Sequence, residues 1–334
     1  MGCHRSGTNL LYDMLLSSGG FAIYRGLLPV YKSLVPRFGS MSKRSNRERI
    51  LATWLRSKGF RRTGLQPEQI SSRILNDCRT AGDFTRVVMD AIAAQQNVNR
   101  WAGYDADHVL HVAQIKRDIP NALFAHIIRD GRDIALSLKK MGGFTPLPWD
   151  RSESDSLVAT ALYWEWMVRR GREAGRSIPT DYIEIRYEDL VTHPRETLAR
   201  LGTFIDHDLD YDRIQRASLG RLSETNSSFR EEGKANIHPV GRWKERLSTA
   251  NVASIEAAVG ASLEENGYPL SVPAAERHIT LRSSWMRATY PAFLSGKHWL
   301  KVNTPLGRLA DISAMELAET PRDLPSQTAP EKFL

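Results

Sequence analysis

The sequence predicts an α/β fold in which a central parallel sheet lies between helices, giving three layers. Three units of the chain support this prediction, around residues 1–17, 123–141 and 182–205. In the second and third units a short strand-like run precedes a polar turn, and apolar residues then recur at helical spacing. Successive units of this kind predict parallel strands covered on both faces.

The first unit is a glycine-containing loop, Gly2–Gly7, that leads into a helix. The helix is indicated by apolar residues on one face: Leu10, Leu11, Met14 and Leu15. Glycine permits a positive φ and a close approach of the backbone, and the first turn of a helix offers unpaired N–H groups at the positive end of its dipole. We therefore predict that this loop holds a phosphate or a sulfate.

The loop differs from the one that binds ATP or GTP with Mg²⁺. That loop has Lys after its second glycine, followed by a hydroxyl that binds the metal. Here Thr8 and Asn9 occupy these positions, and the positive charge of Arg5 precedes the second glycine. The loop is therefore expected to bind a nucleotide phosphate but not a Mg²⁺-bound γ-phosphate.

The boundaries of the predicted domain follow from composition. A loop of this kind usually follows a buried strand of about five or six residues, whereas only Met1–Cys3 are available here, so the first strand is expected to be truncated. The main domain is predicted over 1–268 and an aromatic C-terminal appendage over 269–318. Residues 319–334 are polar and proline-rich and are expected to be disordered.

The charge balance is basic, because 46 Lys and Arg residues oppose 38 Asp and Glu residues and give a net charge of +8. Part of the excess lies in residues 32–62, where Glu48 is the only acidic residue. Such a cluster suits an anionic partner or simply a solvated helix surface. Two cysteines are too few for a disulfide framework or a structural zinc site, and no apolar run is long enough to span a bilayer. These features predict a cytoplasmic protein.

The second unit is an apolar strand over residues 123–128 with a turn and a helix after it. Arg129 stands at the carboxyl end of the strand, where ligands bind in open α/β sheets, and Ser137 follows in the helix. Both side chains are expected to face the same anion. Alternatively, Arg129 forms an ion pair with Asp130 or Asp133, and Ser137 is a neutral helix residue.

The third unit is an alternating strand over Tyr182–Tyr187, followed by a helix that Thr192–Pro194 is expected to begin with a capping residue and a proline in the first turn. Farther along, residues 238–246 place basic side chains around Trp243. Such a loop can clamp a phosphate and an adenine-like ring, or it can form the edge of a lid.

Four motifs now occur in order: Arg5–Thr8 before a helix, Arg129–Ser137 after a strand, Arg186–Leu190 at the end of a later strand, and Gly241–Lys244. Together they resemble the sulfotransferases that use 3′-phosphoadenosine 5′-phosphosulfate (PAPS), particularly the bacterial and Golgi-type branch with an Arg-Ser-Gly-Thr loop. The resemblance covers roughly residues 1–268. It implies a P-loop-like fold and transfer of a sulfuryl group from PAPS to a hydroxyl or amine, with release of 3′-phosphoadenosine 5′-phosphate (PAP).

The resemblance also implies roles for single residues. The loop around the 5′-phosphosulfate would consist of Arg5, Ser6, Gly7, Thr8, Asn9 and Leu10. Arg129 and Ser137 would hold the 3′-phosphate, Tyr187 would lie near the adenine, and the loop that carries Arg242 would close over the 3′-phosphate side. Arg5 would stabilise the leaving oxygen in place of a metal ion, so no metal site is expected.

The general base is not in either of the family's two usual positions. Cytosolic members carry a His where this chain has Tyr104–Ala106, and tyrosylprotein-type members carry a Glu where it has Arg25-Gly26. A general base must reach the proton of the acceptor. We predict His108 for this role, with Asp105 and His111 behind it, although His108 can equally cap or pack a helix.

Two other functions are compatible with parts of the sequence. A P-loop kinase or other nucleotide-binding enzyme would need the Lys and the hydroxyl that Thr8 and Asn9 replace. A non-catalytic protein that binds anions or nucleic acid would use the basic cluster, but few stacking aromatics accompany it, so no nucleic acid is expected.

Another departure from the family is Asn236–His238, which stands where cytosolic members have an Arg-Lys-Gly triplet. Small-molecule, carbohydrate, lipid-linked and peptide acceptors all stay open.

Overall fold

The computed structural model describes residues 1–140, 152–217, 240–277 and 280–317. The chain divides into two compact units. Unit 1 comprises Met1–Ser18, Tyr104–Val112 and Leu123–Lys297, and unit 2 comprises Gly19–Gly103, Ala113–Ala122 and His298–Leu334. The predicted division into 1–268 and 269–318 stays a prediction, and the tail over 319–334 lies outside the described residues.

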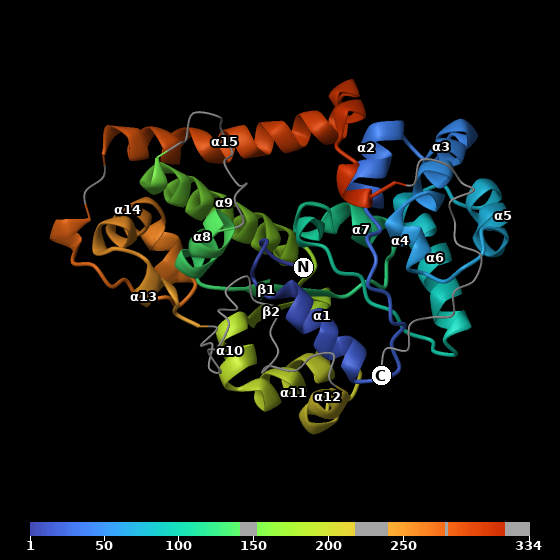
Figure 1. Cartoon of the computed structure of the whole chain (residues 1–334), viewed down its shortest axis with the longest axis horizontal. Helices are drawn as coiled ribbons and strands as arrows, with labels where there is room; N and C mark the ends of the chain where they lie inside the picture. The colour runs from blue at the N-terminus through green and yellow to red at the C-terminus, as the bar shows by residue number, and fades with distance from the viewer. Residues whose placement is uncertain (141–151, 218–239, 278–279, 318–334) are drawn as a thin grey trace. The chain divides into compact units, whose positions relative to one another are not determined.

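Unit 1 contains a parallel pair of strands, β1 (Phe124–Ile128) and β2 (Tyr182–Arg186), with Phe124 opposite Tyr182 and Ile128 opposite Arg186. These are the two strands predicted from the sequence, and both predictions are confirmed. The sheet is smaller than expected, because the described part of the chain is mostly helical and contains one two-stranded sheet (Figure 1).

Met1 extends the hydrogen bonding of this sheet. Its amino group donates to the carbonyl oxygen of Ala125 at 2.8 Å, and its own carbonyl accepts from the N–H of Ile127 at 2.9 Å. These two bonds bracket His126 as a parallel neighbour would. The loop that follows therefore starts beside the carboxyl half of β1.

Helices cover the sheet of unit 1 and carry most of its core. Their bounds are α1 Thr8–Ser17, α8 Gly131–Lys140, α9 Glu153–Arg176, α10 Tyr187–Thr192, α11 Pro194–Ile205, α12 Tyr211–Ala217, α13 Trp243–Arg246, α14 Thr249–Glu265 and most of α15 Leu281–Asn303. Short 3-10 helices lie at Ala106–Leu110, Pro179–Asp181 and Ala274–Glu276. Pro194 is the first residue of α11 as predicted, but the predicted cap is wrong, because α10 ends at Thr192 and His193 takes the N-cap position without a side-chain cap.

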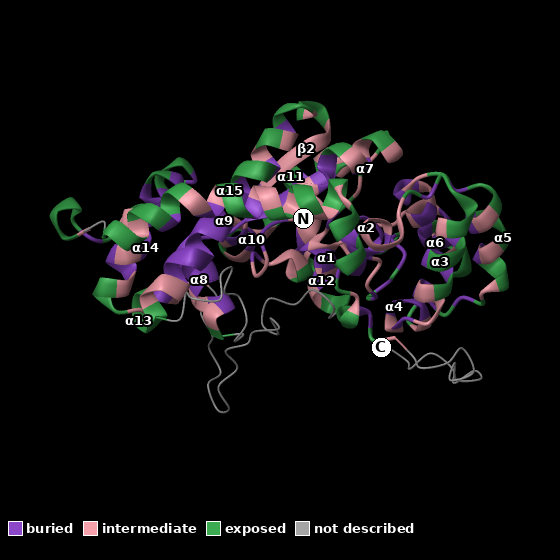
Figure 2. Cartoon of the chain, turned by 90° about the horizontal axis from the view of Figure 1, so that it is seen from above, coloured by how far each residue is buried: buried purple, intermediate pink, exposed green. Residues whose placement is uncertain are grey.

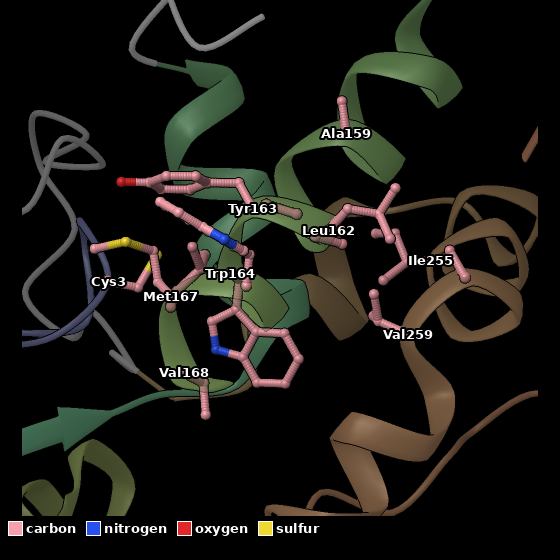
Figure 3. Close-up of a cluster of buried hydrophobic side chains, with 14 of the residues drawn as sticks. Cys3, Ala159, Leu162, Tyr163, Trp164, Met167, Val168, Ile255 and Val259 are labelled. Atoms are coloured by element: carbon pink, nitrogen blue, oxygen red, sulfur yellow. The ribbon is translucent and has the colours of Figure 1, made fainter. Parts of the chain in front are cut away.

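The larger core of unit 1 forms around α9, whose central residues are buried on all sides. Figure 3 shows Cys3 of the first loop beside Met167, and Ile255 and Val259 of α14 on the side of Leu162. Trp164 is fully buried, and its Nε1 donates to the carbonyl oxygen of Arg129 at 2.9 Å. The core of α9 thus fixes the end of β1.

The packing of α8 against α9 also explains a glycine in the second motif. A Cβ atom at Gly131 would lie 2.6 Å from the Cε3 atom of Trp164, so a larger residue there would displace the indole. With glycine at this position α8 approaches α9 closely and is buried along most of its length (Figure 2). The turn after β1 is therefore shaped by the packing of α8 against the core.

Unit 2 is helical and has its own core. Its helices are α2 Val35–Phe38, α3 Arg44–Leu55, α4 Lys58–Arg61, α5 Glu68–Asn76, α6 Ala81–Gln95 and α7 Val112–Asp118, with a π-helical turn at Val30–Leu34 and 3-10 turns at Pro305–Leu309 and Ser313–Met315. Trp54 packs edge-on against Phe60 and Phe84, with ring centroids 5.1 and 5.4 Å apart.

Part of the basic cluster over residues 32–62 has a structural role inside unit 2. Arg47 is buried and donates hydrogen bonds to the carbonyl oxygens of Leu75, Met41 and Ser42 at 2.9, 2.7 and 3.1 Å. Lys58 pairs with Glu316 at 2.6 Å. These two cations stabilise the unit itself, which weakens the argument that the cluster is a surface for nucleic acid.

Candidate active site

The first loop leaves the N-terminus of α1 open. Arg5 and Gly7 both adopt left-handed backbone conformations, with φ of 72° and 96°. Gly7 is the N-cap residue, no side chain caps the helix, and its first turn contains no acidic residue. The first N–H groups of α1 and its dipole therefore favour an anion.

The shape of this loop depends on Tyr187, the first residue of α10. A Cβ atom at Gly7 would lie 2.4 Å from Cδ2 of the Tyr187 ring. Only glycine permits both this approach and the left-handed φ. The tyrosine expected near an adenine is thus placed directly against the first loop.

Arg5 contacts two of the residues predicted to bind the same ligand. Its Nε donates to the hydroxyl oxygen of Ser137 on α8 at 3.0 Å, and its carbonyl oxygen accepts from Nη1 of Arg129 at 3.2 Å. Three segments that are far apart in the sequence therefore meet at one place.

Arg129 also has the alternative role considered from the sequence. Its Nη2 lies 3.4 Å from Oδ2 of Asp133, and its guanidinium carbon lies 4.4 Å from the centre of the Tyr187 ring. The ion pair and the ring hold the guanidinium beside the loop. Arg129 is thus oriented by its neighbours and remains next to Arg5.

The pKa values of two arginines are consistent with a concentration of positive charge here. Burial, and after it the like charge of Arg129, lowers the pKa of Arg5. The same two causes, in the same order, lower the pKa of Arg242. Because the charge of Arg129 disfavours the charged forms of Arg5 and Arg242, a multivalent anion beside the open N-terminus of α1 would be stabilised here.

Asp133 fixes the loop that carries Arg242. Its carboxylate accepts hydrogen bonds from the backbone N–H groups of Gly241 at 2.9 Å and of Trp243 at 3.0 Å. The Trp243 indole N–H donates to Asp130 at 3.2 Å. Burial raises the pKa of Asp133, while the charge of Arg129 and these N–H groups lower it, and burial prevails. From the sequence, Asp133 was expected only as an ion-pair partner of Arg129, and its contact with the loop was not predicted.

The side chain of Ser6 is buried, with 1 % of its surface exposed, and its hydroxyl has no hydrogen-bond partner among the described residues. Buried polar groups without a partner are uncommon, and a ligand can satisfy them. Of the other predicted loop residues, Thr8 and Leu10 are half-buried and Asn9 is exposed in the first turn of α1.

The segment around the 3-10 helix Ala106–Leu110 contains imidazole and carboxylate groups. His108 is half-buried in the 3-10 helix Ala106–Leu110, which Asp105 caps by accepting the N–H of Asp107 at 3.0 Å. His111 is buried. Asp105 therefore has the capping role that the sequence analysis allowed for His108, and His108 retains a partly exposed side chain.

His4 was missed by the sequence analysis although it precedes Arg5 directly. Its Nδ1 lies 2.9 Å from the hydroxyl of Tyr163 on α9. Burial, then Cys3 and Asp107, raises the pKa of Tyr163, so the phenol keeps its proton. When that hydroxyl donates to Nδ1, Nε2 of the neutral ring carries the proton and is a donor suited to an anion. The only sequence signal for His4 was its position directly before Arg5 in the first motif.

No group of three or more His, Cys, Asp or Glu side chains lies close enough to bind a metal ion in the described ranges. None of the helices in the same ranges combines the length and the apolar character needed to cross a bilayer.

A sequence profile of the sulfotransferase family matches residues 1–211. A sulfotransferase domain from the Synechococcus PCC 7002 olefin synthase has a similar structure, with a TM-score of 0.51, 16% identity, and coverage of 81% of this chain and 94% of that one. A sulfotransferase domain from the curacin biosynthetic pathway has a TM-score of 0.49 and 15% identity over 81% of this chain and 96% of that one. No curated protein matches the chain significantly. The first structural match shows a sulfotransferase fold.

Proposed function

Because the chain belongs to the sulfotransferase family, we propose that this enzyme transfers a sulfuryl group from PAPS to a hydroxyl or amine acceptor and releases PAP. The observation that supports this proposal best is the grouping of Arg5, Arg129 and Arg242 beside the N-terminus of α1. Two phosphate groups and a sulfate need more positive charge than a single helix N-terminus supplies.

The residues present fit PAPS. The buried hydroxyl of Ser6 and the open N–H groups from Gly7 to Leu10 suit the 5′-phosphosulfate. Arg129, Ser137 and Arg242 would hold the 3′-phosphate, and Tyr187 would contact the adenine. PAPS supplies an activated sulfuryl group. The hydroxyl or amine of the acceptor would attack its sulfur while the bond between sulfur and the bridging phosphate oxygen breaks.

Arg5 and Thr8, with the loop N–H groups, would stabilise the negative charge that develops on the leaving oxygen. Arg5 is suited to this task because Ser137 and Arg129 hold it on both its side chain and its backbone. The proton of the acceptor would pass to His108, with His111 behind it, while Asp105 positions their segment. The cytoplasmic location and the absence of a nucleic-acid partner remain predictions.

Binding of PAP is the first test. At a ligand concentration of about 100 times Kd, PAP is expected to stabilise the protein by about 2.7 kcal/mol, which is a rise of several degrees in Tm. AMP lacks the 3′-phosphate and should give a much smaller rise in a thermal-shift experiment with equal concentrations of the two ligands.

Two outcomes of this experiment would contradict the proposal. A larger rise with ATP and Mg²⁺ than with PAP would indicate a kinase or another nucleotide-binding enzyme. No rise with PAP, together with salt-sensitive binding of single-stranded DNA, would indicate a non-catalytic protein that binds nucleic acid.

Asp133→Asn tests whether the Arg242 loop contributes to recognition of the 3′-phosphate. The amide keeps the shape but has one acceptor oxygen for two N–H groups and no charge for Arg129. We expect PAP to bind at least about tenfold more weakly, a difference of about 1.4 kcal/mol, and AMP to bind almost as before, by calorimetry. Asp155→Asn, in an acidic residue at the start of α9, is the control. Equal losses for PAP and AMP would contradict a role specific to the 3′-phosphate.

A further inference from the structure

The first loop directs two neighbouring side chains to different helices. The N–H of Ser6 donates to the carbonyl oxygen of Cys3 at 3.1 Å, which closes a tight turn. His4 and Arg5 are the two central residues of this turn. The guanidinium of Arg5 reaches α8, whereas the imidazole of His4 reaches Tyr163 of α9. The loop therefore presents an imidazole as well as a guanidinium.

Tyr163 holds the imidazole of His4 from one side. Its hydroxyl lies 2.9 Å from Nδ1 of His4, and the tyrosine is only 6% exposed in the core around α9. Its oxygen points to the side of this core on which Cys3 lies (Figure 3). A phenol is a better hydrogen-bond donor than acceptor, and burial raises the pKa of this one, so we assign the shared proton to Tyr163. Nε2 of His4 then carries the proton of the neutral ring.

Nε2 of His4 is a donor that the protein itself leaves unused. His4 is half-buried, and its Nε2 makes no hydrogen bond to any residue that the structure describes. Protonation of the ring would not change this property, because both nitrogens of an imidazolium carry protons. A donor held in the loop before an open helix N-terminus suits an oxygen atom of a bound anion.

Tyr163 lies beside the segment that is proposed to receive the proton of the acceptor. Burial, then Cys3, and then the carboxylates of Asp107 and Asp105 raise its pKa, so both carboxylates lie near its hydroxyl. The 3-10 helix Ala106–Leu110 also packs against α9. The hydroxyl that holds the imidazole is therefore next to this segment.

The direction of the proposed reaction places sulfur near His4. Arg5 would face the leaving oxygen, and the segment that carries His108 would receive the proton of the acceptor. In such a displacement the attacking atom, the sulfur and the leaving oxygen lie roughly in line, as in phosphoryl transfer. The sulfuryl group would then lie between Arg5 and that segment. His4 directly precedes Arg5, and its partner Tyr163 lies next to the segment.

We propose that Nε2 of His4 donates a hydrogen bond to an oxygen atom of the sulfuryl group of PAPS and thereby distinguishes PAPS from PAP. This inference rests on the proposed function. His4 would bind the group that is transferred, and Tyr163 would be a positioning residue that sets the tautomer and the orientation of the imidazole. The contact would be lost when the sulfuryl group moves to the acceptor, which favours exchange of PAP for PAPS.

Two other roles fit His4 less well. A general base at this position would need Nε2 without a proton, whereas donation from Tyr163 to Nδ1 leaves the proton on Nε2. An imidazole with a purely structural role would be expected to use both nitrogens, whereas only Nδ1 is bonded within the described part of the chain.

Calorimetry of the full chain with PAPS and with PAP, without an acceptor, tests the proposal. His4→Ala should bind PAPS at least about tenfold more weakly, the loss expected for one hydrogen bond to a charged group, and PAP within about twofold of the wild type. His4→Gln should restore most of the affinity for PAPS, because its amide nitrogen can take the place of Nε2 as a donor.

Tyr163→Phe separates positioning from packing. The ring stays and the hydroxyl is lost, so PAPS should bind several-fold more weakly while PAP binds as before. His193→Ala is the matched control, because His193 is exposed and its Nδ1 also lies 2.9 Å from a hydroxyl, that of Thr192. This control should bind both ligands as the wild type does. The readout is the ratio of the two Kd values, which general damage to the fold would leave unchanged.

Three results would overturn the proposed role of His4. The first is wild-type affinity for PAPS in His4→Ala. The second is an equal loss of affinity for PAPS and PAP in that variant, which would indicate a structural role. The third is an affinity of His4→Gln for PAPS as low as that of His4→Ala. A wild type that prefers PAP to AMP would in each case leave the proposed function standing, whereas a wild type that binds neither PAPS nor PAP would contradict both.

Discussion

Arg5→Ala is expected to lower kcat for sulfuryl transfer by about 10²–10³-fold, the usual loss when one preorganised donor to a developing charge is removed. The guanidinium is fixed by Ser137 and lies beside the open N-terminus of α1. No other residue of the loop from Gly2 to Gly7 is a Lys or Arg that could replace it. The variant should remain folded, because Arg5 is only half-buried.

The measurement is kcat at saturating PAPS with an acceptor that the wild type sulfates, together with Tm. Alanine has a similar backbone cost to arginine at a φ of 72°, so strain at this position should not change greatly. Arg170→Ala, in an exposed arginine of α9, is the control and should keep wild-type kcat. A wild-type rate in Arg5→Ala would contradict the assignment of this cation to the leaving oxygen.

Arg132→Met is expected to lower the free energy of unfolding by about 3–5 kcal/mol, because it leaves buried carboxylates without their cation. Arg132 donates to Asp130 at 2.8 and 3.1 Å and to Glu256 at 2.6 Å. The side chains of Arg132 and Glu256 are 2% and 0% exposed. Burial lowers the pKa of Arg132, but the bonds to the two carboxylates outweigh it and raise that pKa overall.

The loss of Arg132 should affect more than its ion pairs with Asp130 and Glu256. Its guanidinium carbon lies 3.9 Å from the centre of the Trp243 ring, so its loss should also loosen the loop that carries Arg242. The measurement is chemical unfolding followed by circular dichroism. Arg195→Met breaks a pair with Asp212 of similar length, 2.6 Å, but on the surface. The control should unfold close to the wild type, and equal losses in the two variants would contradict a special role for the buried network.

Sequence patterns were sufficient to predict those parts of the site whose shape is determined by residues adjacent in the sequence. The apolar run before Arg129 predicts β1, and the glycines around Arg5 predict an open loop, because each is a local property of the chain. The direct contact of Arg5 with Ser137 was not anticipated, because the two residues were expected at different ends of the same ligand.

The contacts that sequence reasoning missed join residues far apart in the chain. Asp133 binds Gly241 across 108 positions, and His4 meets Tyr163 across 159. Neither pair leaves a periodic signal, because one partner sits in a loop in both cases. The identity of Asp105 as a cap was missed for another reason: a short 3-10 helix has too few residues to show a pattern.

The anchoring of Gly241 and Trp243 to Asp133 has a consequence for the rates of binding and release. A loop that is already held in place loses little conformational entropy when ligand arrives, so association is not slowed by a search for the closed arrangement. If the nucleotide binds beneath this loop as proposed, its departure past Arg242 would require the two backbone bonds to Asp133 and the indole bond to Asp130 to open. The residence time of the nucleotide, and with it the turnover of the enzyme, would then depend on how fast these three bonds break.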